Sequence, residues 1–247
     1  MKRVAVVYRG GISYRQSRFQ GTRGDGTGDY VDFEQCLESI NRNLHGSNTD
    51  WEIDTYIHCW NFDLKNSLMS LLRPIGYNFP NYRRYKLGIL IRTILSYINL
   101  LRSDGISAIK SKMRLNIFRR EFAGISQALS IKLGLSLIPE HKLKSYDLIV
   151  LLRPDVLLKK QIFLSDYNAS KITLNNSGNL RGDFRFIFSP DFVSGFLGLY
   201  NSVFFGNFHS LHSWIPKYLV SLYGDVVVED NIVAGVDEEV MRKLSAL

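Results

Sequence analysis

A short apolar run near the start of the sequence ends in an arginine and two glycines. The run is Val4–Tyr8, and Arg9, Gly10 and Gly11 follow it directly. A guanidinium matches the geometry of phosphate oxygens, and glycine lets the backbone approach a ligand closely. The pattern predicts a strand whose carboxyl end binds a phosphorylated ligand. The residues expected there are Tyr8, Arg9, Gly10, Gly11 and, further along the chain, Arg15. The alternative for the two arginines is a solvated surface pair.

A second alternating segment ends in a histidine and a tryptophan. Glu52–His58 reads as a strand, and Cys59 and Trp60 follow it. In an extended chain His58 and Trp60 face the same side, two residues apart. An imidazole beside an aromatic ring suits stacking on a base or a sugar. The alternative is a core tryptophan beside a hydrogen-bonded histidine.

A third segment, Tyr146–Leu152, is almost continuously apolar and stops at Arg153-Pro154-Asp155. Such a run indicates a central strand that is covered on both faces, and a proline cannot continue its ladder. Asp155 is therefore expected just past the strand end, where open α/β sheets hold their ligands. Its carboxylate is a candidate ligand for Mg²⁺ or Mn²⁺. The alternative is an aspartate that caps the turn.

These three segments need a sheet with parallel strands and covering helices. Alternating strand and helix patterns predict an α/β fold with one domain over residues 1–247, and no internal repeat interrupts it. Cys36 and Cys59 are the only cysteines, which indicates buried thiols rather than a disulfide framework. The expected helices are 32–44, 116–133 with Gly134 at its C-terminal end, 192–204 and 212–222. The further expected strands are 171–175, 183–188 and, as the last, 225–228.

Positive charge gathers in one part of the chain. Residues 81–120 hold ten Lys and Arg against one acid, Asp104, whereas the remainder holds 21 basic and 22 acidic residues. We expect a basic helical insertion here that faces an anionic partner. Within it, Leu87–Leu101 is too short to span a bilayer. It reads either as an amphipathic helix on an anionic membrane surface or as a core-packing helix.

Together, the three strand ends resemble a group of bacterial and large-virus glycosyltransferases of the polysaccharide or lipopolysaccharide type. The matching segments are Val4–Gly11, Asp54–Trp60 and Asp147–Asp155, in that order. The resemblance implies a GT-A-like fold with a mostly parallel central sheet flanked by helices. It also implies an enzyme that moves a hexose or pentose from a nucleotide sugar to a glycan or lipid-linked acceptor, in the cytoplasm or at the inner membrane face.

The same resemblance assigns chemical roles. A departing nucleoside diphosphate needs a metal ion or cationic side chains, and the usual Asp-x-Asp metal motif is absent. Asp155 with Mg²⁺ or Mn²⁺, or a metal-free clamp that includes Arg153, would serve. An inverting reaction also needs a carboxylate base, for which Asp183 is the first candidate and Glu229 and Asp230 the next. The alternatives are a nucleic-acid-binding protein that uses residues 81–120, although nucleic acid is not expected, and an inactive glycan-binding relative.

Overall fold

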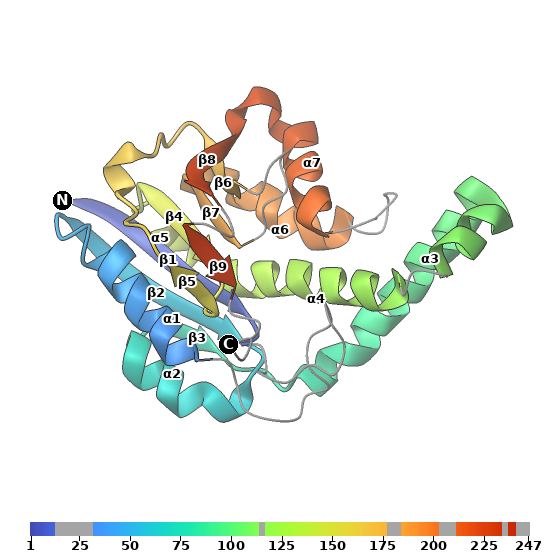
Figure 1. Cartoon of the computed structure of the whole chain (residues 1–247), viewed down its shortest axis with the longest axis horizontal. Coiled ribbons are helices and arrows are strands. Elements are labelled where there is room, and N and C mark those ends of the chain that lie inside the picture. The colour runs from blue at the N-terminus through green and yellow to red at the C-terminus, as the bar shows by residue number, and fades with distance from the viewer. Residues whose placement is uncertain (13–31, 114–116, 177–183, 203–210, 234–236, 241–247) are drawn as a thin grey trace, which may run out of the picture.

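A computed structural model describes residues 1–12, 32–113, 117–176, 184–202, 211–233 and 237–240 (Figure 1). Its strands are β1 (Lys2–Gly10), β2 (Trp51–Cys59), β3 (Gly76–Asn78), β4 (Leu148–Leu152), β5 (Val156–Leu158), β6 (Ile172–Asn176), β7 (Arg185–Phe188), β8 (Val227–Val233) and β9 (Glu238–Val240). Its helices are α1 (Phe33–Ile40), α2 (Lys65–Leu72), α3 (Tyr82–Met113), α4 (Ile117–Leu135), α5 (Glu140–Leu143), α6 (Val193–Ser202) and α7 (Leu211–Tyr223).

Seven of the described strands form one mixed sheet in the order β3-β2-β1-β4-β7-β6-β8. The pairs β1–β2, β1–β4, β2–β3 and β6–β8 are parallel, whereas β7 runs antiparallel to both β4 and β6. Strands β5 and β9 form a separate antiparallel pair. The expected α/β architecture with a mostly parallel sheet flanked by helices is confirmed.

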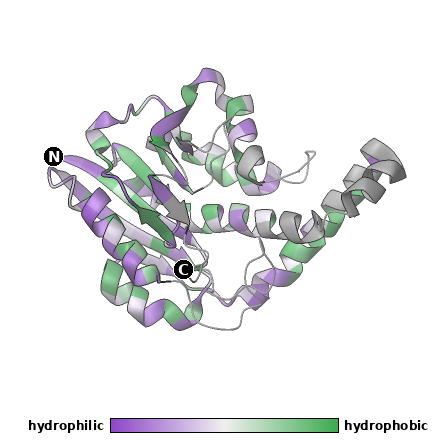
Figure 2. Cartoon of the chain, viewed as in Figure 1, coloured by the Kyte–Doolittle hydropathy of each residue, from purple (hydrophilic) through white to green (hydrophobic). Residues whose placement is uncertain are grey.

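Both faces of the sheet are covered, and this explains the composition of its strands. All five residues of β4, the central strand, are buried, as a doubly covered strand requires. Side chains of β1 alternate between two apolar cores: Val4 and Val6 pack with α1, α2 and β5, while Ala5 and Val7 pack with α3, α4, α6 and α7. The central strand β4 is green in the hydropathy colouring, whereas its neighbours also carry purple and pale stretches (Figure 2).

The N-terminal parts of the fold follow the expected pattern closely. Helix α1 starts where Asp32 accepts a hydrogen bond from the Gln35 amide at 3.0 Å, which caps the first turn. A π-helical turn, Asn41–His45, continues it, so the helix expected over 32–44 is present in two parts. The expected strands at Val4–Tyr8 and Glu52–His58 are each longer by a few residues.

The expectation that Gly134 lies at the C-terminal end of its helix is confirmed to within one residue, because α4 ends at Leu135. Two other expectations were wrong in detail. The strand expected to end at Val228 continues to Val233, and β9 follows it, so Glu229 and Asp230 lie within β8 and not past the last strand. The short elements α2, β3, α5 and β5 had not been expected, since they carry too few residues for a periodic signal.

Helix α3 is the most extended feature of the fold. It is a single helix of 32 residues that takes in the predicted segment Leu87–Leu101, and its C-terminal part reaches beyond the body of the sheet (Figure 1). Ile89 and Thr93 are buried against the body. Among the helices described, none is both long and apolar enough to cross a bilayer.

Candidate functional site

The sheet reverses its strand order at β1, and this places the three predicted strand ends together. From β1 the chain adds β2 and then β3 on one side, whereas β4 pairs with β1 on the other side. Arg9 is opposite His58, and Tyr8 is opposite Leu152, so Arg153 comes next along the same edge. In open α/β sheets, ligands bind at such a reversal, outside the carboxyl ends of the strands.

Like Arg153, Arg9 is a buried arginine at this edge. The side chain is fully buried, and its guanidinium carbon lies 5.9 Å from the centre of the Phe186 ring. A β-carbon on Gly134 would lie 3.1 Å from Val7 Cγ1 and 3.4 Å from Arg9 Cβ. Helix α4 therefore packs closely against β1 at Val7 and Arg9.

The turn after β1 is fixed by its own backbone and by one side chain from the segment that follows β2. Gly10 has a φ of 104°, a conformation that favours glycine, and its carbonyl accepts a 3.1 Å hydrogen bond from the Trp60 amide. Asn61 Oδ1 accepts a 2.7 Å hydrogen bond from the Ile12 amide. A β-carbon on Gly11 would lie 3.1 Å from that same oxygen. Sequence reasoning missed Asn61, although its position next to Trp60 was a usable signal.

His58 and Trp60 share one face of β2, as the alternation predicted, with their ring centres 4.5 Å apart and edge to face. His58 is fully buried, and neither ring nitrogen has a hydrogen-bond partner among the described residues. Burial lowers the pKa of His58 to about 3, so the imidazole is neutral near pH 7. Trp60 is half-buried and contacts Tyr82 and Tyr85 of α3 at ring distances of 5.1 and 5.5 Å.

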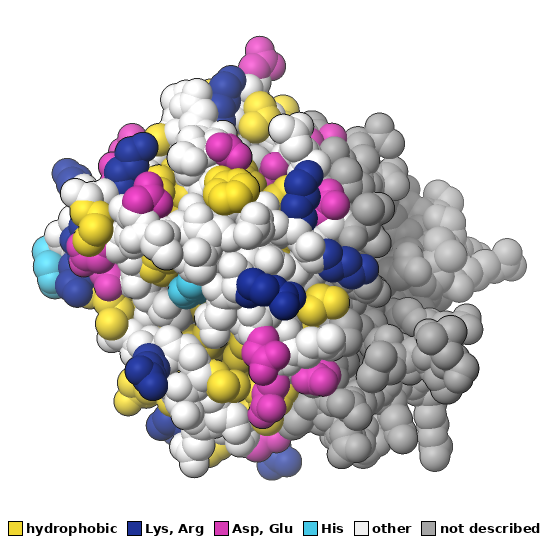
Figure 3. Space-filling model, turned by 60° about the vertical axis from the view of Figure 1, so that its left-hand side comes forward, with side chains coloured by type: hydrophobic (Ala, Val, Ile, Leu, Met, Phe, Trp, Pro, Cys, Tyr) yellow, Lys and Arg dark blue, Asp and Glu magenta, His cyan; other side chains and the backbone are white. Residues whose placement is uncertain are grey.

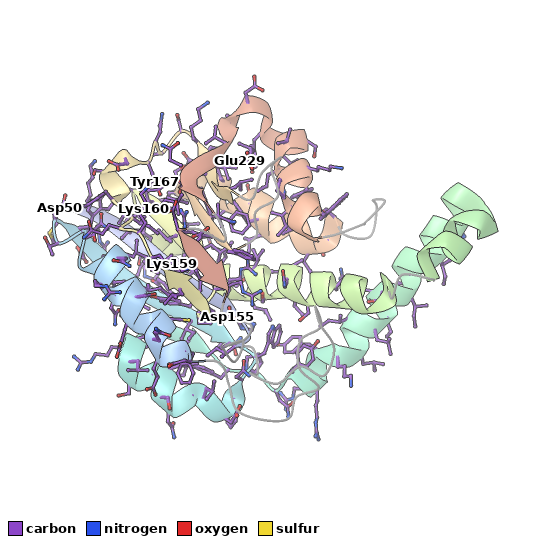
Figure 4. All side chains as sticks on the ribbon, viewed as in Figure 1. Asp50, Asp155, Lys159, Lys160, Tyr167 and Glu229 are labelled. Atoms are coloured by element: carbon purple, nitrogen blue, oxygen red, sulfur yellow. The ribbon has the colours of Figure 1, made fainter. Side chains whose placement is uncertain are left out.

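Arg153 and Asp155 face each other across Pro154. Arg153 Nε donates to Asp155 Oδ1 at 2.8 Å, and Nη2 donates to Oδ2 at 2.7 Å. Both side chains are buried, and Asp155 lies beside the β5–β9 ribbon (Figure 4). This is a bidentate, charge-assisted pair, the geometry that a planar guanidinium favours.

The pair bears on whether Asp155 serves a metal ion. Both of its oxygens accept from a guanidinium, so the negative charge of Asp155 is already balanced by one buried cation. Across the described parts of the chain, no three His, Cys, Asp or Glu side chains gather as a ligand set. The described residues therefore supply no ready ligand set for Mg²⁺ or Mn²⁺, and no step proposed below passes through such an ion.

Two thiols lie beneath the same edge. Cys36 of α1 and Cys59 of β2 are both buried and unoxidised. Burial raises the pKa of each thiol to about 12, and the negative charge of Asp155 adds to the effect. Protonated thiols of this kind behave as small apolar side chains, as the sequence had indicated. They are packing residues and not nucleophiles.

A second buried ionic cluster had no signal in the sequence. Arg185 of β7 donates from Nε to Glu238 at 3.0 Å and from Nη1 to Asp230 at 2.7 Å. The hydroxyl of Tyr167, labelled in Figure 4, donates to the same Asp230 oxygen at 2.7 Å. Arg185 and Glu238 are fully buried. The cluster ties β9, and through it β5, to the main sheet, so it holds the strand that follows Asp155.

Some of the remaining predicted residues lie in the core or in the cluster around Arg185, and the others lie outside the described residues. Tyr8 is a core residue: it is fully buried, its hydroxyl lies 3.2 Å from His45 Nε2, and burial raises its pKa. Asp230 is held in the cluster around Arg185, while Glu229 lies beside it on β8. Arg15 and Asp183 lie outside the described residues, as does the glycine-rich segment 20–29.

The arrangement at this edge is a buried arginine, a tight glycine turn, a neutral histidine with an aromatic neighbour, and an arginine held by an aspartate. A hollow lined by Glu140, His141 and Lys144 lies on α5, which precedes β4 and so belongs to the opposite edge. No family model matches the sequence, and no curated protein matches it.

Proposed function

We propose that the protein is a nucleotide-sugar-dependent glycosyltransferase whose donor lies across the carboxyl ends of β1, β2 and β4. The observation that carries this proposal is the strand-order reversal, because it gathers Arg9, Trp60 and Arg153 at the one edge where open α/β sheets bind ligands. The GT-A-like character of the fold is part of the proposal. It is supported by the mostly parallel sheet and by the small β5–β9 pair next to Asp155.

Each side chain at the edge has a role in this reaction. Arg9 stabilises the charge that develops on the departing diphosphate, since a buried guanidinium acts more strongly there than in water. The backbone at Gly10 and Gly11 approaches the phosphates, since glycine has no side chain to hold the ligand away. Trp60, which is half-buried, offers a ring for stacking on the base or the sugar. Asp155 orients Arg153 through its two hydrogen bonds.

These groups and one carboxylate base account for the bond that breaks, the bond that forms and the proton that moves in the transfer. The bond between the sugar C1 and the diphosphate oxygen breaks, and its electron pair leaves with the nucleoside diphosphate. The acceptor hydroxyl oxygen forms the new bond to C1 and gives its proton to a carboxylate, for which Asp183 stays our candidate. The acceptor is a glycan or a lipid-linked sugar.

A second candidate uses the same site without turnover. Asp155 is paired with Arg153, and the candidate base Asp183 lies outside the described residues. A catalytically inactive relative that binds a nucleotide sugar or a glycan would keep this arrangement. Donor binding without sugar transfer or donor hydrolysis would favour it.

The test is a thermal-shift screen of UDP-, GDP-, CMP- and dTDP-sugars, each with and without Mn²⁺. A ligand that binds only the folded state at one hundred times its Kd stabilises by about 2.7 kcal/mol. We expect one nucleotide to raise the Tm and Mn²⁺ to add nothing. A shift that needs Mn²⁺ would contradict the metal-free clamp, and no shift with any donor would contradict the proposed function.

A pair of variants on one strand locates the donor. Arg9→Lys keeps the charge but loses the planar fork, so it should weaken the donor shift. Arg3→Lys makes the same change at the amino end of β1, where Arg3 pairs with Glu52 and Asp54. The donor shift should be unchanged in that control. An equal loss in both variants would place the donor elsewhere.

A further inference from the structure

The outward face of α3 carries a stripe of exposed aliphatic side chains. Exposed fractions are 65% for Leu87, 49% for Ile91, 45% for Ile94, 43% for Leu95 and 38% for Ile98. On the other side of the helix, Ile89 and Thr93 are fully buried against the body. The helix therefore has two apolar faces, and only one of them is covered by the described residues.

The five exposed side chains form one surface and are not scattered. Successive helical residues are about 100° apart, so this set lies within about 60° of the direction opposite Ile89. A water-facing helix surface is normally polar, and an apolar patch rimmed by charge marks an interaction site. We call these five residues, Leu87, Ile91, Ile94, Leu95 and Ile98, the α3 stripe.

Cations rim the α3 stripe. Arg83, Arg84 and Lys86 are exposed at its start, and Arg102 is exposed beyond Ile98. Over residues 82–113 the sequence has seven Lys and Arg and one acid. The body is different: the face in Figure 3 shows cationic and anionic side chains interspersed. The partner of this helix is therefore anionic at its surface and apolar beneath.

Charge also decides between the possible occupants. A symmetric dimer through α3 would place the same cationic rim against itself, since a two-fold interface brings identical patches together. A nucleic acid would match the cations but not the exposed aliphatic side chains. An anionic lipid bilayer matches both, with headgroups at the arginines and acyl chains at the stripe.

We propose that the α3 stripe and its basic rim seat the protein on the interface of an anionic membrane. The helix lies in the plane of the interface and does not cross it. Trp60 at the end of β2 contacts Tyr82 and Tyr85 in the first turn of α3. The seated helix would thus bring the carboxyl edge of the sheet close to a lipid-linked acceptor, a consequence that rests on the proposed function, whereas lipid binding itself does not.

The test is co-sedimentation of the full chain with vesicles of phosphatidylcholine alone and of phosphatidylcholine mixed with phosphatidylglycerol. We expect binding to the mixed vesicles, weakened by salt because surface charges are screened. Replacing Leu87, Ile91 and Ile98 with Gln should reduce it about tenfold or more, because the buried apolar area is lost. Leu71, Phe163 and Leu222 are comparably exposed elsewhere, and replacing them with Gln should leave binding unchanged.

A second comparison addresses charge. Replacing Arg83, Arg84 and Lys86 with Gln should weaken binding to the mixed vesicles. The matched control replaces Lys144, Lys159 and Lys160, which are exposed on the body, and should not. Equal sedimentation of all variants, or equal binding to both kinds of vesicle, would overturn the proposal. So would a wild-type dimer in light scattering that the stripe variant loses.

The donor screen separates this proposal from the proposed function. The stripe variant should keep the wild-type Tm and the wild-type donor shift, which shows that its fold and donor edge are intact. If no protein shows a donor shift but lipid binding still depends on the α3 stripe, the membrane proposal stands and the glycosyltransferase proposal fails. If the donor shift is present and lipid binding is absent, the reverse holds.

Discussion

Arg153 donates two hydrogen bonds to Asp155 two residues further along the chain, and both side chains are buried at the end of the central strand. A buried pair of this kind contributes little compared with two apolar residues, but breaking it leaves one charge uncompensated. The interaction between the two side chains is therefore measured by the coupling of their substitutions and not by either substitution alone.

Asp155→Asn should lower the free energy of unfolding by about 3–5 kcal/mol, because Arg153 is left buried without its counter-charge. Adding Arg153→Met removes that charge, so the double variant should lose less than the two single losses added together. Urea unfolding of the four proteins measures this coupling. Additive losses would mean that the two side chains do not act as a pair. Asp155→Asn should also abolish donor turnover, assayed where the variant is still folded.

Gly10 should be intolerant of a side chain for conformational reasons. Its φ of 104° is strained for any L-residue, so Gly10→Ala should cost about 1–3 kcal/mol and weaken donor binding by moving the turn. Gly88 of α3 is the control, because a β-carbon there meets nothing within 4 Å. Gly88→Ala should stabilise by up to about 1 kcal/mol, since alanine favours a helix. Thermal unfolding of both variants measures the two changes in stability. Equal changes in Gly10→Ala and Gly88→Ala would contradict the prediction.

His58 should make the protein sensitive to acid. Because its pKa is lowered to about 3, the unfolded chain binds more protons than the folded one between about pH 3 and the ordinary histidine value of 6.5. Its contribution to stability is thus fully present above pH 6.5 and is lost as the pH falls. The loss attributable to His58, once the pH has fallen to its folded-state pKa of about 3, is up to about 5 kcal/mol. Unfolding free energies of wild type and His58→Leu across this range measure it.

The same variant separates a packing role from a binding role for His58. Neither ring nitrogen has a partner among the described residues, so His58→Leu should cost little stability at pH 7. If His58 contacts the donor, the variant should nevertheless lose affinity for it. Among the histidines that the structure describes, His45 also has a pKa that burial lowers, and His45→Leu reports how much of the acid sensitivity comes from that residue. An unchanged pH profile in His58→Leu would contradict the assignment.

The strand ends could be predicted from sequence because each one is local. The apolar runs before Arg9 and Arg153 and the alternation before His58 need only neighbouring residues to be recognised, and their adjacency follows once the strands are parallel. The pairing of Arg153 with Asp155 was also within reach, since only Pro154 separates them. The role of Asp155 as a metal ligand stays a prediction, because a carboxylate after a strand can either bind a cation or, as here, pair with a neighbouring arginine.

The cluster around Arg185 lay beyond sequence reasoning for a physical reason. Glu238 is 53 positions from its partner and Asp230 is 45, and nothing in the intervening pattern indicates that β9 folds back to pair with β5. Long-range pairings depend on topology. The full length of α3 was missed for another reason. Its two apolar faces give a weak amphipathic pattern, so only the aliphatic segment Leu87–Leu101 could be recognised in the sequence.

Glu238→Gln should loosen the strand that follows Asp155. Arg185 is fully buried and balances Glu238 and Asp230, so removing one carboxylate leaves its charge less compensated and should cost about 3 kcal/mol. Burial raises the pKa of Glu238, and the positive charge of Arg185 opposes that rise. The glutamine of the variant is neutral and therefore resembles the protonated form of Glu238. The control is Glu52→Gln in the exposed pair with Arg3, which should barely move the unfolding midpoint.

Hydrogen exchange locates the effect within the sheet. Leu158 pairs with Glu238, and Val156 with Val240, so β5 depends on β9 for its outer edge. In Glu238→Gln the amides of Val156–Leu158 should exchange faster, whereas those of β1, which has parallel neighbours on both sides, should keep their wild-type protection. Faster exchange throughout the sheet would indicate global destabilisation. Unchanged exchange in β5 would show that the cluster around Arg185 does not hold the strand beside Asp155.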